Sequence, residues 1–104
     1  MWIFANKGFF SIVASPEPGK LLVRARIKGD IENAFPGHEV LANAGTDYEY
    51  RATVPKAEVQ KVLTDAIQGI DYTNFKNSCE PERARRYSKV WAAMAAACNG
   101  RLGT

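Results

Sequence analysis

The first 27 residues contain two short apolar runs, at residues 2–5 and 9–14, and a stretch from Lys20 to Ile27 in which apolar and polar side chains alternate with the period of two that is typical of β-strands. Strands are predicted at residues 2–5 and 9–14, and the Asn6-Lys7-Gly8 segment between them is typical of the three-residue turn of a bulged hairpin. The second strand is apolar on nearly both faces, so it is expected to lie inside the sheet. A third strand is predicted at residues 20–27, with Leu21, Val23, Ala25 and Ile27 on its buried face and Leu22, Arg24 and Arg26 on its solvated, basic face.

The pattern from residue 29 to residue 54 predicts a short helix and a second hairpin. Asp30 is suited to cap the free backbone donors of this helix, which ends at Pro36-Gly37. Strands are predicted at residues 38–43 and 48–54, with a turn at residues 44–47 between them. In the later strand, aromatic and apolar side chains alternate with polar ones. The first set is Tyr48, Tyr50, Ala52 and Val54, and the second is Glu49, Arg51 and Thr53.

Two longer helices complete the chain. The first begins at Pro55, and Gly69 is expected to end it in the left-handed conformation. Its apolar positions recur at helical spacing and are Val59, Val62, Leu63, Ala66 and Ile67. The last helix begins near Pro81 and is expected to stop at Asn99-Gly100. Its apolar stripe comprises Tyr87, Val90, Trp91, Met94 and Cys98, and the first four of these are predicted to be core that anchors the helix to the sheet.

These elements predict an α+β fold. Because strands that are adjacent in sequence mostly pair with each other, we expect a two-layer sandwich, in which an antiparallel sheet of about five strands carries two main helices on one face. Residues 21–69, in the order strand, helix, strand, strand, helix, look like part of a ferredoxin-like arrangement. A chain of 104 residues is long enough to bury a core of its own, so residues 1–104 are predicted to form a single domain.

Composition and charge point to an ordinary soluble protein. The formal net charge of +3 permits an anionic partner without requiring one. No apolar run approaches the roughly 20 residues that span a bilayer, and the apolar N-terminal residues are typical of a strand rather than of a signal peptide. If one helix joins Cys79 and Cys98, the two thiols lie about 27 Å apart, beyond disulfide reach. Two free thiols favour a reducing compartment, so a cytoplasmic location without a membrane partner is predicted.

Candidate catalytic residues are few. The chain has one histidine, His38, next to a turn, and no CxxC or HxxxH spacing that would favour a zinc site. The glycines are dispersed and form neither a P-loop nor a dinucleotide fingerprint. The carboxylate pairs Asp47 with Glu49 and Glu80 with Glu82 are typical of solvated charge. No cofactor and no catalytic residue is predicted, and an enzyme that uses His38, Asp47, Glu49 or Asp71 is the third hypothesis.

Basic and aromatic side chains are the better candidates for a binding site. They gather in the C-terminal third of the chain and on the predicted open sheet face. The candidates are Arg83, Arg85, Arg86 and Lys89 at the start of the last helix, Lys76, Tyr72 and Phe75 before it, and Arg24, Arg26 and Arg51 on the sheet. Arginines beside aromatic residues on a sheet are typical of RNA-binding surfaces, whereas arginines paired with nearby glutamates are ordinary solvated charge.

Several short motifs are spread over residues 1–94. They are Met1-Trp2-Ile3-Phe4, Gly8-Phe9-Phe10-Ser11-Ile12-Val13, Leu21-Leu22-Val23-Arg24-Ala25-Arg26, Phe35-Pro36-Gly37, Asp47-Tyr48-Glu49-Tyr50-Arg51, Ile70-Asp71-Tyr72-Thr73-Asn74-Phe75-Lys76 and Tyr87-Ser88-Lys89-Val90-Trp91-Ala92-Ala93-Met94. Together they resemble a widespread family of small uncharacterised bacterial proteins. The resemblance implies a cytoplasmic protein of a bacterium, a phage or a mobile element, and it carries over no activity.

The leading functional hypothesis is a non-enzymatic binding or regulatory protein that acts through contacts with another protein. One version is a phage or mobile-element accessory that inhibits a host defence complex. The alternative is a nucleic-acid-binding module that uses the basic sheet face and the basic start of the last helix. The oligomeric state is left open.

Overall fold

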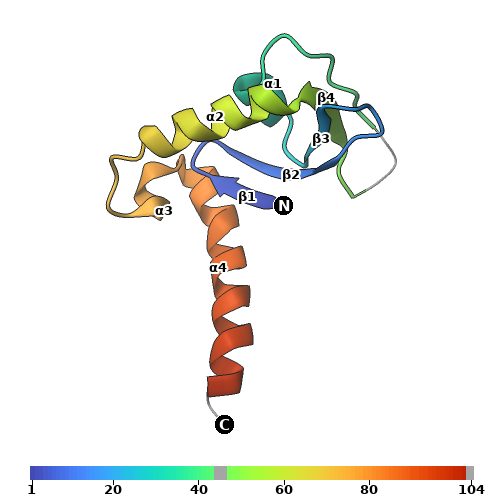
Figure 1. Ribbon diagram of the computed structural model, residues 1–104. Helices are drawn as coiled ribbons and strands as arrows, with labels where there is room; N and C mark the ends of the chain where they lie inside the picture. Colours follow the sequence, from blue (N-terminus) through green and yellow to red (C-terminus); the bar gives the residue numbers. More distant parts are fainter. Residues whose placement is uncertain (44–46, 103–104) are drawn as a thin grey trace. The chain divides into compact units, whose positions relative to one another are not determined.

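The structure, a computed structural model, describes the backbone of residues 1–43 and 47–102 and the side chains of these ranges up to Cys98. The chain divides into two compact units, Met1–Asp71 and Tyr72–Thr104. Each unit has its own elements and its own packing (Figure 1). The single domain predicted from the sequence therefore stays a prediction.

The first unit is built on an antiparallel sheet of four strands. These are β1 (Trp2–Ala5), β2 (Gly8–Ala14), β3 (Lys20–Ala25) and β4 (Tyr50–Pro55). They lie in the order β1-β2-β3-β4, so each strand pairs with its neighbour in sequence (Figure 1). The α+β class and the inner position of β2 are confirmed. The first turn is shorter than predicted, because Ala5 pairs directly with Gly8 and only Asn6 and Lys7 connect them.

The fifth strand, predicted at residues 38–43, is absent from the described part of the chain. Only one residue of this segment pairs with the sheet: Leu41 and Arg51 exchange two backbone hydrogen bonds of 2.9 and 3.0 Å. Asn43 then adopts a left-handed backbone with φ 55°, which ends the extended conformation that a ladder needs. The predicted turn at 44–47 falls mainly on residues 44–46, outside the described residues, and Tyr48 precedes β4 instead of belonging to it.

Two helices of the first unit, α1 (Asp30–Ala34) and α2 (Lys56–Gln68), contribute to one hydrophobic core. The core residues are Phe10, Ile12, Val23, Ala25, Ile31, Phe35, Ala52, Val54 and Val59. Pro55 is both the last residue of β4 and the N-cap of α2, and Lys56 N–H donates to the Gly19 carbonyl at 2.9 Å. Gly69 ends α2 with φ −83°, so the predicted left-handed cap is wrong.

The meander order also differs from a ferredoxin-like arrangement, in which a helical crossover joins parallel strands. Here α1 lies between β3 and β4, which are antiparallel neighbours. Of the two main helices that were predicted on the sheet, α2 contributes Val59 to the core of the first unit, whereas the last helix belongs to the second unit. The two-layer sandwich with both helices on one face therefore stays a prediction.

Asp30 has a different role from the helix cap that its position predicts. The N-cap of α1 is Gly29, whose φ of 94° favours glycine, and no side chain caps this helix. Asp30 is instead the first helical residue and is 2% exposed. Its Oδ2 accepts a hydrogen bond of 3.0 Å from the backbone N–H of Phe9 in β2. The carboxylate therefore ties the start of α1 to the sheet.

The second unit contains a short helix, α3 (Phe75–Ser78), and a long helix, α4 (Pro81–Leu102). Asn74 caps α3, because its Oδ1 accepts a hydrogen bond of 2.9 Å from Asn77 N–H. α4 continues past the predicted stop at Asn99-Gly100 and ends at Leu102. Cys79 and Cys98 are free thiols, as expected.

The predicted core stripe of α4 is only partly buried. The ring of Tyr87 is 8% exposed and stacks on Phe75 with centroids 5.8 Å apart and planes 7° from parallel. Val90, Trp91 and Met94 are exposed, at 38%, 74% and 61%. The helical period predicts which face of a helix is apolar, but α3 has four residues and packs only beside the first turns of α4. The prediction that these three residues are core is therefore wrong.

Candidate binding surfaces

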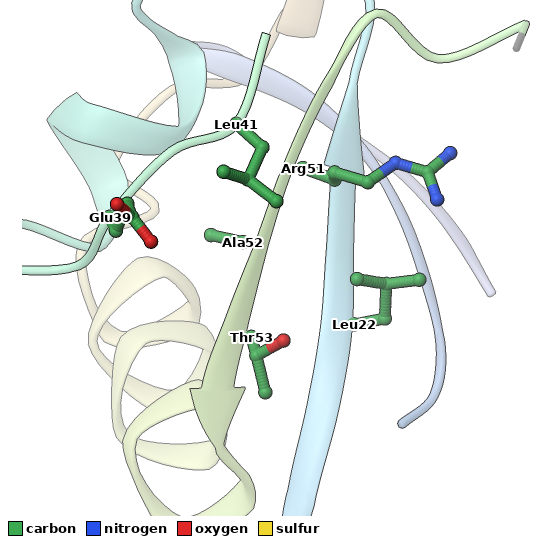
Figure 2. A pocket seen from close by; sticks show the side chains of 6 residues that line it. All are labelled: Leu22, Glu39, Leu41, Arg51, Ala52 and Thr53. Atoms are coloured by element: carbon green, nitrogen blue, oxygen red, sulfur yellow. The ribbon is translucent and has the colours of Figure 1, made fainter. Parts of the chain in front are cut away.

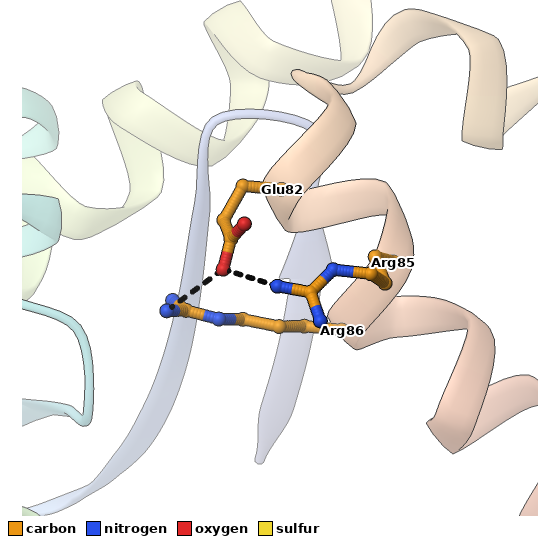
Figure 3. A network of polar contacts seen from close by, with 3 residues as sticks. All are labelled: Glu82, Arg85 and Arg86. Carbon is orange, nitrogen blue, oxygen red and sulfur yellow. Dashed lines mark hydrogen bonds and ion pairs between the residues drawn. The ribbon is translucent and has the colours of Figure 1, made fainter.

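The arginines at the start of α4 are paired within the helix. Arg85 Nη2 lies 2.7 Å from Glu82 Oε1, and Arg86 Nη2 lies 3.4 Å from the same oxygen (Figure 3). The hydrogen bond and charge of Arg85, with a smaller effect of Arg86, hold the pKa of the Glu82 carboxyl below its ordinary value. The same hydrogen bond raises the pKa of Arg85. One carboxylate thus offsets part of the charge of two exposed arginines.

This pair gives a pH-dependent prediction. Because the pKa of Glu82 is lowered in the folded helix, its contribution to stability is present above 4.5, the ordinary value, and is lost as the pH falls through the lower folded value. In a carboxyl NMR titration, the Glu82 midpoint is expected below 4.5 and should rise toward it in Arg85→Ala. An unchanged midpoint in Arg85→Ala would contradict the assigned cause.

The remaining candidates near α4 divide into packed and solvated side chains. Arg83 is half-buried, and its Nη1 donates to the Tyr87 hydroxyl at 3.3 Å. Tyr72 and Phe75 are half-buried and tilt against each other, with centroids 6.0 Å apart. These side chains hold α3 against the base of α4. Lys76 and Lys89 are exposed.

Beyond this packed base, α4 has an exposed apolar surface, and the helix is strongly basic. We call Val90, Trp91 and Met94 the α4 patch. These positions are three or four residues apart, or adjacent, so the side chains lie on one side of the helix. After Glu82 the sequence has no acidic residue and has five basic ones: Arg83, Arg85, Arg86, Lys89 and Arg101.

A second surface lies on the face of the sheet opposite the hydrophobic core. Residues that are directly opposite on neighbouring strands share a face, and the register aligns Trp2, Ser11, Arg24 and Arg51 across the four strands. Phe4 stacks on Phe9 on the same face, with centroids 4.4 Å apart. Together with Arg26 and Tyr48, described next, these residues form what we call the sheet face.

Tyr48 organises the arginines of the sheet face. The guanidinium carbon of Arg24 lies 4.6 Å from the centroid of the Tyr48 ring, and that of Arg26 lies 5.0 Å from it. The ring also contacts Phe9, with centroids 6.4 Å apart. Arg24 Nη2 donates a hydrogen bond of 2.7 Å to Ser11 Oγ. Cation–π contacts and this hydrogen bond therefore hold the two guanidinium groups above the strands.

Arg51 borders a small pocket beside β4. The pocket has a volume of about 210 Å³ and is lined by Leu22, Glu39, Leu41, Arg51, Ala52 and Thr53. Figure 2 shows the guanidinium group of Arg51 directed away from Leu41. Pockets that enclose drug-sized ligands or cofactors usually have roughly 300–1,000 Å³. This pocket is too small to enclose a nucleotide cofactor.

The candidate catalytic residues do not assemble into a recognisable site. His38 Nε2 lies 2.7 Å from Glu58 Oε2, so the histidine links the segment after α1 to the first turn of α2. Asp47, Glu49 and Asp71 are exposed. Burial and the neighbouring Glu49, to which it hydrogen-bonds, raise the pKa of the Tyr50 hydroxyl. Across residues 1–43 and 47–98, no three His, Cys, Asp or Glu side chains gather where they could hold a metal ion.

Known proteins do not show which surface is used. No family model matches the chain. No curated protein and no solved structure matches it either. The resemblance to small bacterial proteins therefore stays a prediction. No helix in the described part of the chain is long and apolar enough to cross a membrane.

Sequence reasoning missed the aromatic part of both surfaces. Trp2, Phe4 and Phe9 were assigned only to strands, although the alternation of β2 already placed Phe9 with Ser11. Tyr48 was assigned to β4, and no local signal shows that its ring reaches the arginines of β3. Trp91 was assigned to the core, because its spacing is the same for a buried and an exposed helix face.

Proposed function

We propose that this protein is a non-enzymatic binding protein that acts through contact with another protein, and that the α4 patch is its contact surface. The observation that carries this proposal is the exposure of Trp91, at 74%, beside Met94, at 61%. Exposed apolar patches on soluble proteins commonly mark interaction sites, and tryptophan, methionine and arginine are enriched in the cores of interfaces.

The charge around the α4 patch favours an acidic partner. All five charged residues after Glu82 are basic, and three of them, Arg85, Arg86 and Lys89, are exposed on the helix that carries the patch. A second copy of α4 would bring the same positive charge against this helix. A partner with acidic side chains around an apolar groove or helix would complement both the apolar and the basic parts of the surface.

The base of α4 is suited to present this surface in one conformation. The stacked rings of Phe75 and Tyr87 and the hydrogen bond from Arg83 to Tyr87 pack the first turns of the helix. Five of the six alanines in α4, at positions 92, 93 and 95–97, favour helix formation in the part that carries the patch. A helix that is already formed loses less conformational entropy on binding than a disordered segment.

Substitution of Trp91 tests the proposal. The immobilised chain is expected to retain its partner protein in a one-to-one ratio. Trp91→Ala should weaken this interaction by about 30-fold or more, which is the effect of removing an interface hot spot. A variant with Arg85, Arg86 and Lys89 all changed to glutamate should lower the association rate, because it reverses the exposed charge of the helix that carries the patch. Arg83 is left unchanged because it contacts Tyr87.

Trp2→Ala is the matched control, since Trp2 is 69% exposed but lies in β1. Equal retention of the protein by Trp91→Ala and by Trp2→Ala would overturn the role of the α4 patch. Light scattering of the purified chain tests whether a second copy of the chain covers the α4 patch. A dimer that Trp91→Ala abolishes would identify a second copy, rather than an acidic partner, as the occupant.

A further inference from the structure

We propose that the sheet face binds single-stranded nucleic acid, with bases stacked on its aromatic side chains and phosphates held by its arginines. This site lies in the first unit and shares no residue with the α4 patch. The proposal is carried by the arrangement of Trp2, the stacked Phe4 and Phe9 rings, and the arginines around Tyr48.

The aromatic side chains form one part of the surface. Trp2 is 69% exposed, at the end of the row that continues through Ser11 and Arg24. The rings of Phe4 and Phe9 lie in the neighbouring row, stacked 13° from parallel. A flat indole next to paired rings is a surface on which unpaired bases can stack, and stacking accepts any base because each has a π-face.

The arginines form the other part. Arg24 and Arg51 are directly opposite each other on β3 and β4, and Arg26 follows Arg24 by two residues. An anion bound between the two strands would be attracted to both guanidinium groups. A nucleic-acid backbone carries a phosphate on every nucleotide, so one strand can supply an anion to each arginine. A single phosphate ion cannot do this.

Two of the arginines, Arg24 and Arg26, make their contacts with uncharged groups. Glu49, two residues before Arg51, hydrogen-bonds the hydroxyl of Tyr50, a residue that packs against the core. Arg24 makes its hydrogen bond to an uncharged partner, Ser11, which is 1% exposed. Both Arg24 and Arg26 are held by the Tyr48 ring, which orders the cations and leaves their charge intact.

The combination of aromatic side chains and arginines on the sheet face favours single-stranded nucleic acid over other anions. The row from Trp2 to Arg51 crosses three strand spacings, or about 14 Å, and so can follow an extended backbone. A duplex keeps its bases stacked on one another and would contact only the arginines. An acidic peptide would also contact the arginines but would have no bases to place on Trp2.

The two tryptophans allow a direct test. In Trp91→Phe, Trp2 is the only indole in the chain, so its fluorescence reports on the sheet face. Addition of a twelve-nucleotide oligo(dT) or oligo(rU) is expected to quench this fluorescence. With three arginines in contact, log Kd should change with log salt concentration by a slope of about 2, or about 20-fold between 50 and 200 mM salt. Comparison of the two oligonucleotides separates DNA from RNA as the preferred strand.

Variants measured by anisotropy of a labelled oligonucleotide complete the test. Trp2→Ala should weaken binding by about 5- to 150-fold, the effect of one lost stacking contact. Arg26→Glu should weaken binding and reduce the salt slope by about 0.7. Lys61→Glu is the matched charge reversal on α2, where Lys61 pairs with Asp65 at 3.0 Å, and should leave binding within about twofold.

Three results would overturn the proposal. One is the absence of quenching in Trp91→Phe at 50 mM salt. Another is equal binding of a duplex and a single strand with no effect of Trp2→Ala. The third is loss of binding when Arg85, Arg86 and Lys89 are changed to glutamate while Arg26→Glu binds normally, since this would assign the nucleic acid to α4.

Discussion

Phe35→Ala is expected to lower the free energy of unfolding of the first unit by about 3–5 kcal/mol. Phe35 is 1% exposed, and its ring meets Phe10 edge to face with centroids 5.6 Å apart. Removal of the ring would leave a cavity under α1 that the short helix cannot fill. Because small domains are stable by only about 5–15 kcal/mol, this substitution removes a large part of the total.

Urea denaturation followed by far-UV circular dichroism measures this effect. Trp91→Ala removes an even larger aromatic side chain from an exposed position, and it should change the free energy of unfolding by no more than about 0.5 kcal/mol. Equal destabilisation by Phe35→Ala and Trp91→Ala would contradict the assignment of Phe35 to the core and of Trp91 to the surface.

Asp30→Ala is expected to cost about 1–3 kcal/mol, because it removes the buried acceptor of the Phe9 N–H group. Amide hydrogen exchange provides a local measurement. The Phe9 amide should exchange faster in Asp30→Ala, relative to amides in the centre of β3. Asp30→Asn keeps a side-chain oxygen at the same position and should restore part of the protection. Unchanged exchange at Phe9 in Asp30→Ala would show that this carboxylate does not hold β2.

The alternation of the sequence predicted the interior of the sheet well. Val23 and Ala25 are fully buried on the predicted face of β3, and β2 lies between two strands. These properties follow from side-chain period and from pairing between sequence neighbours. The strand predicted at residues 38–43 failed for a different reason. Only Leu41 of this segment pairs with β4, and the backbone of Asn43 is left-handed, a conformation that no apolar pattern encodes.

Long-range contacts explain the other differences. Local sequence predicted that Asp30 caps a helix. Its carboxylate instead accepts a hydrogen bond from the backbone N–H of Phe9, twenty-one residues away. The period of α4 identifies an apolar face, yet it does not predict that α3 covers only the first part of that face. For the sheet face, strand alternation predicted Arg24, Arg26 and Arg51 together, and the register confirms that Arg24 and Arg51 are opposite. The contribution of Tyr48 needed the structure.

The direct connection of β4 to α2 has a consequence for changes in chain length. Pro55 belongs to both elements, and Lys56 N–H is bonded to Gly19, so no connecting residue lies between the strand and the helix. One inserted residue would rotate α2 by about 100° around its axis, since a helical turn takes 3.6 residues. Val59 would then leave the core. Insertions and deletions at this junction are therefore expected to destabilise the first unit.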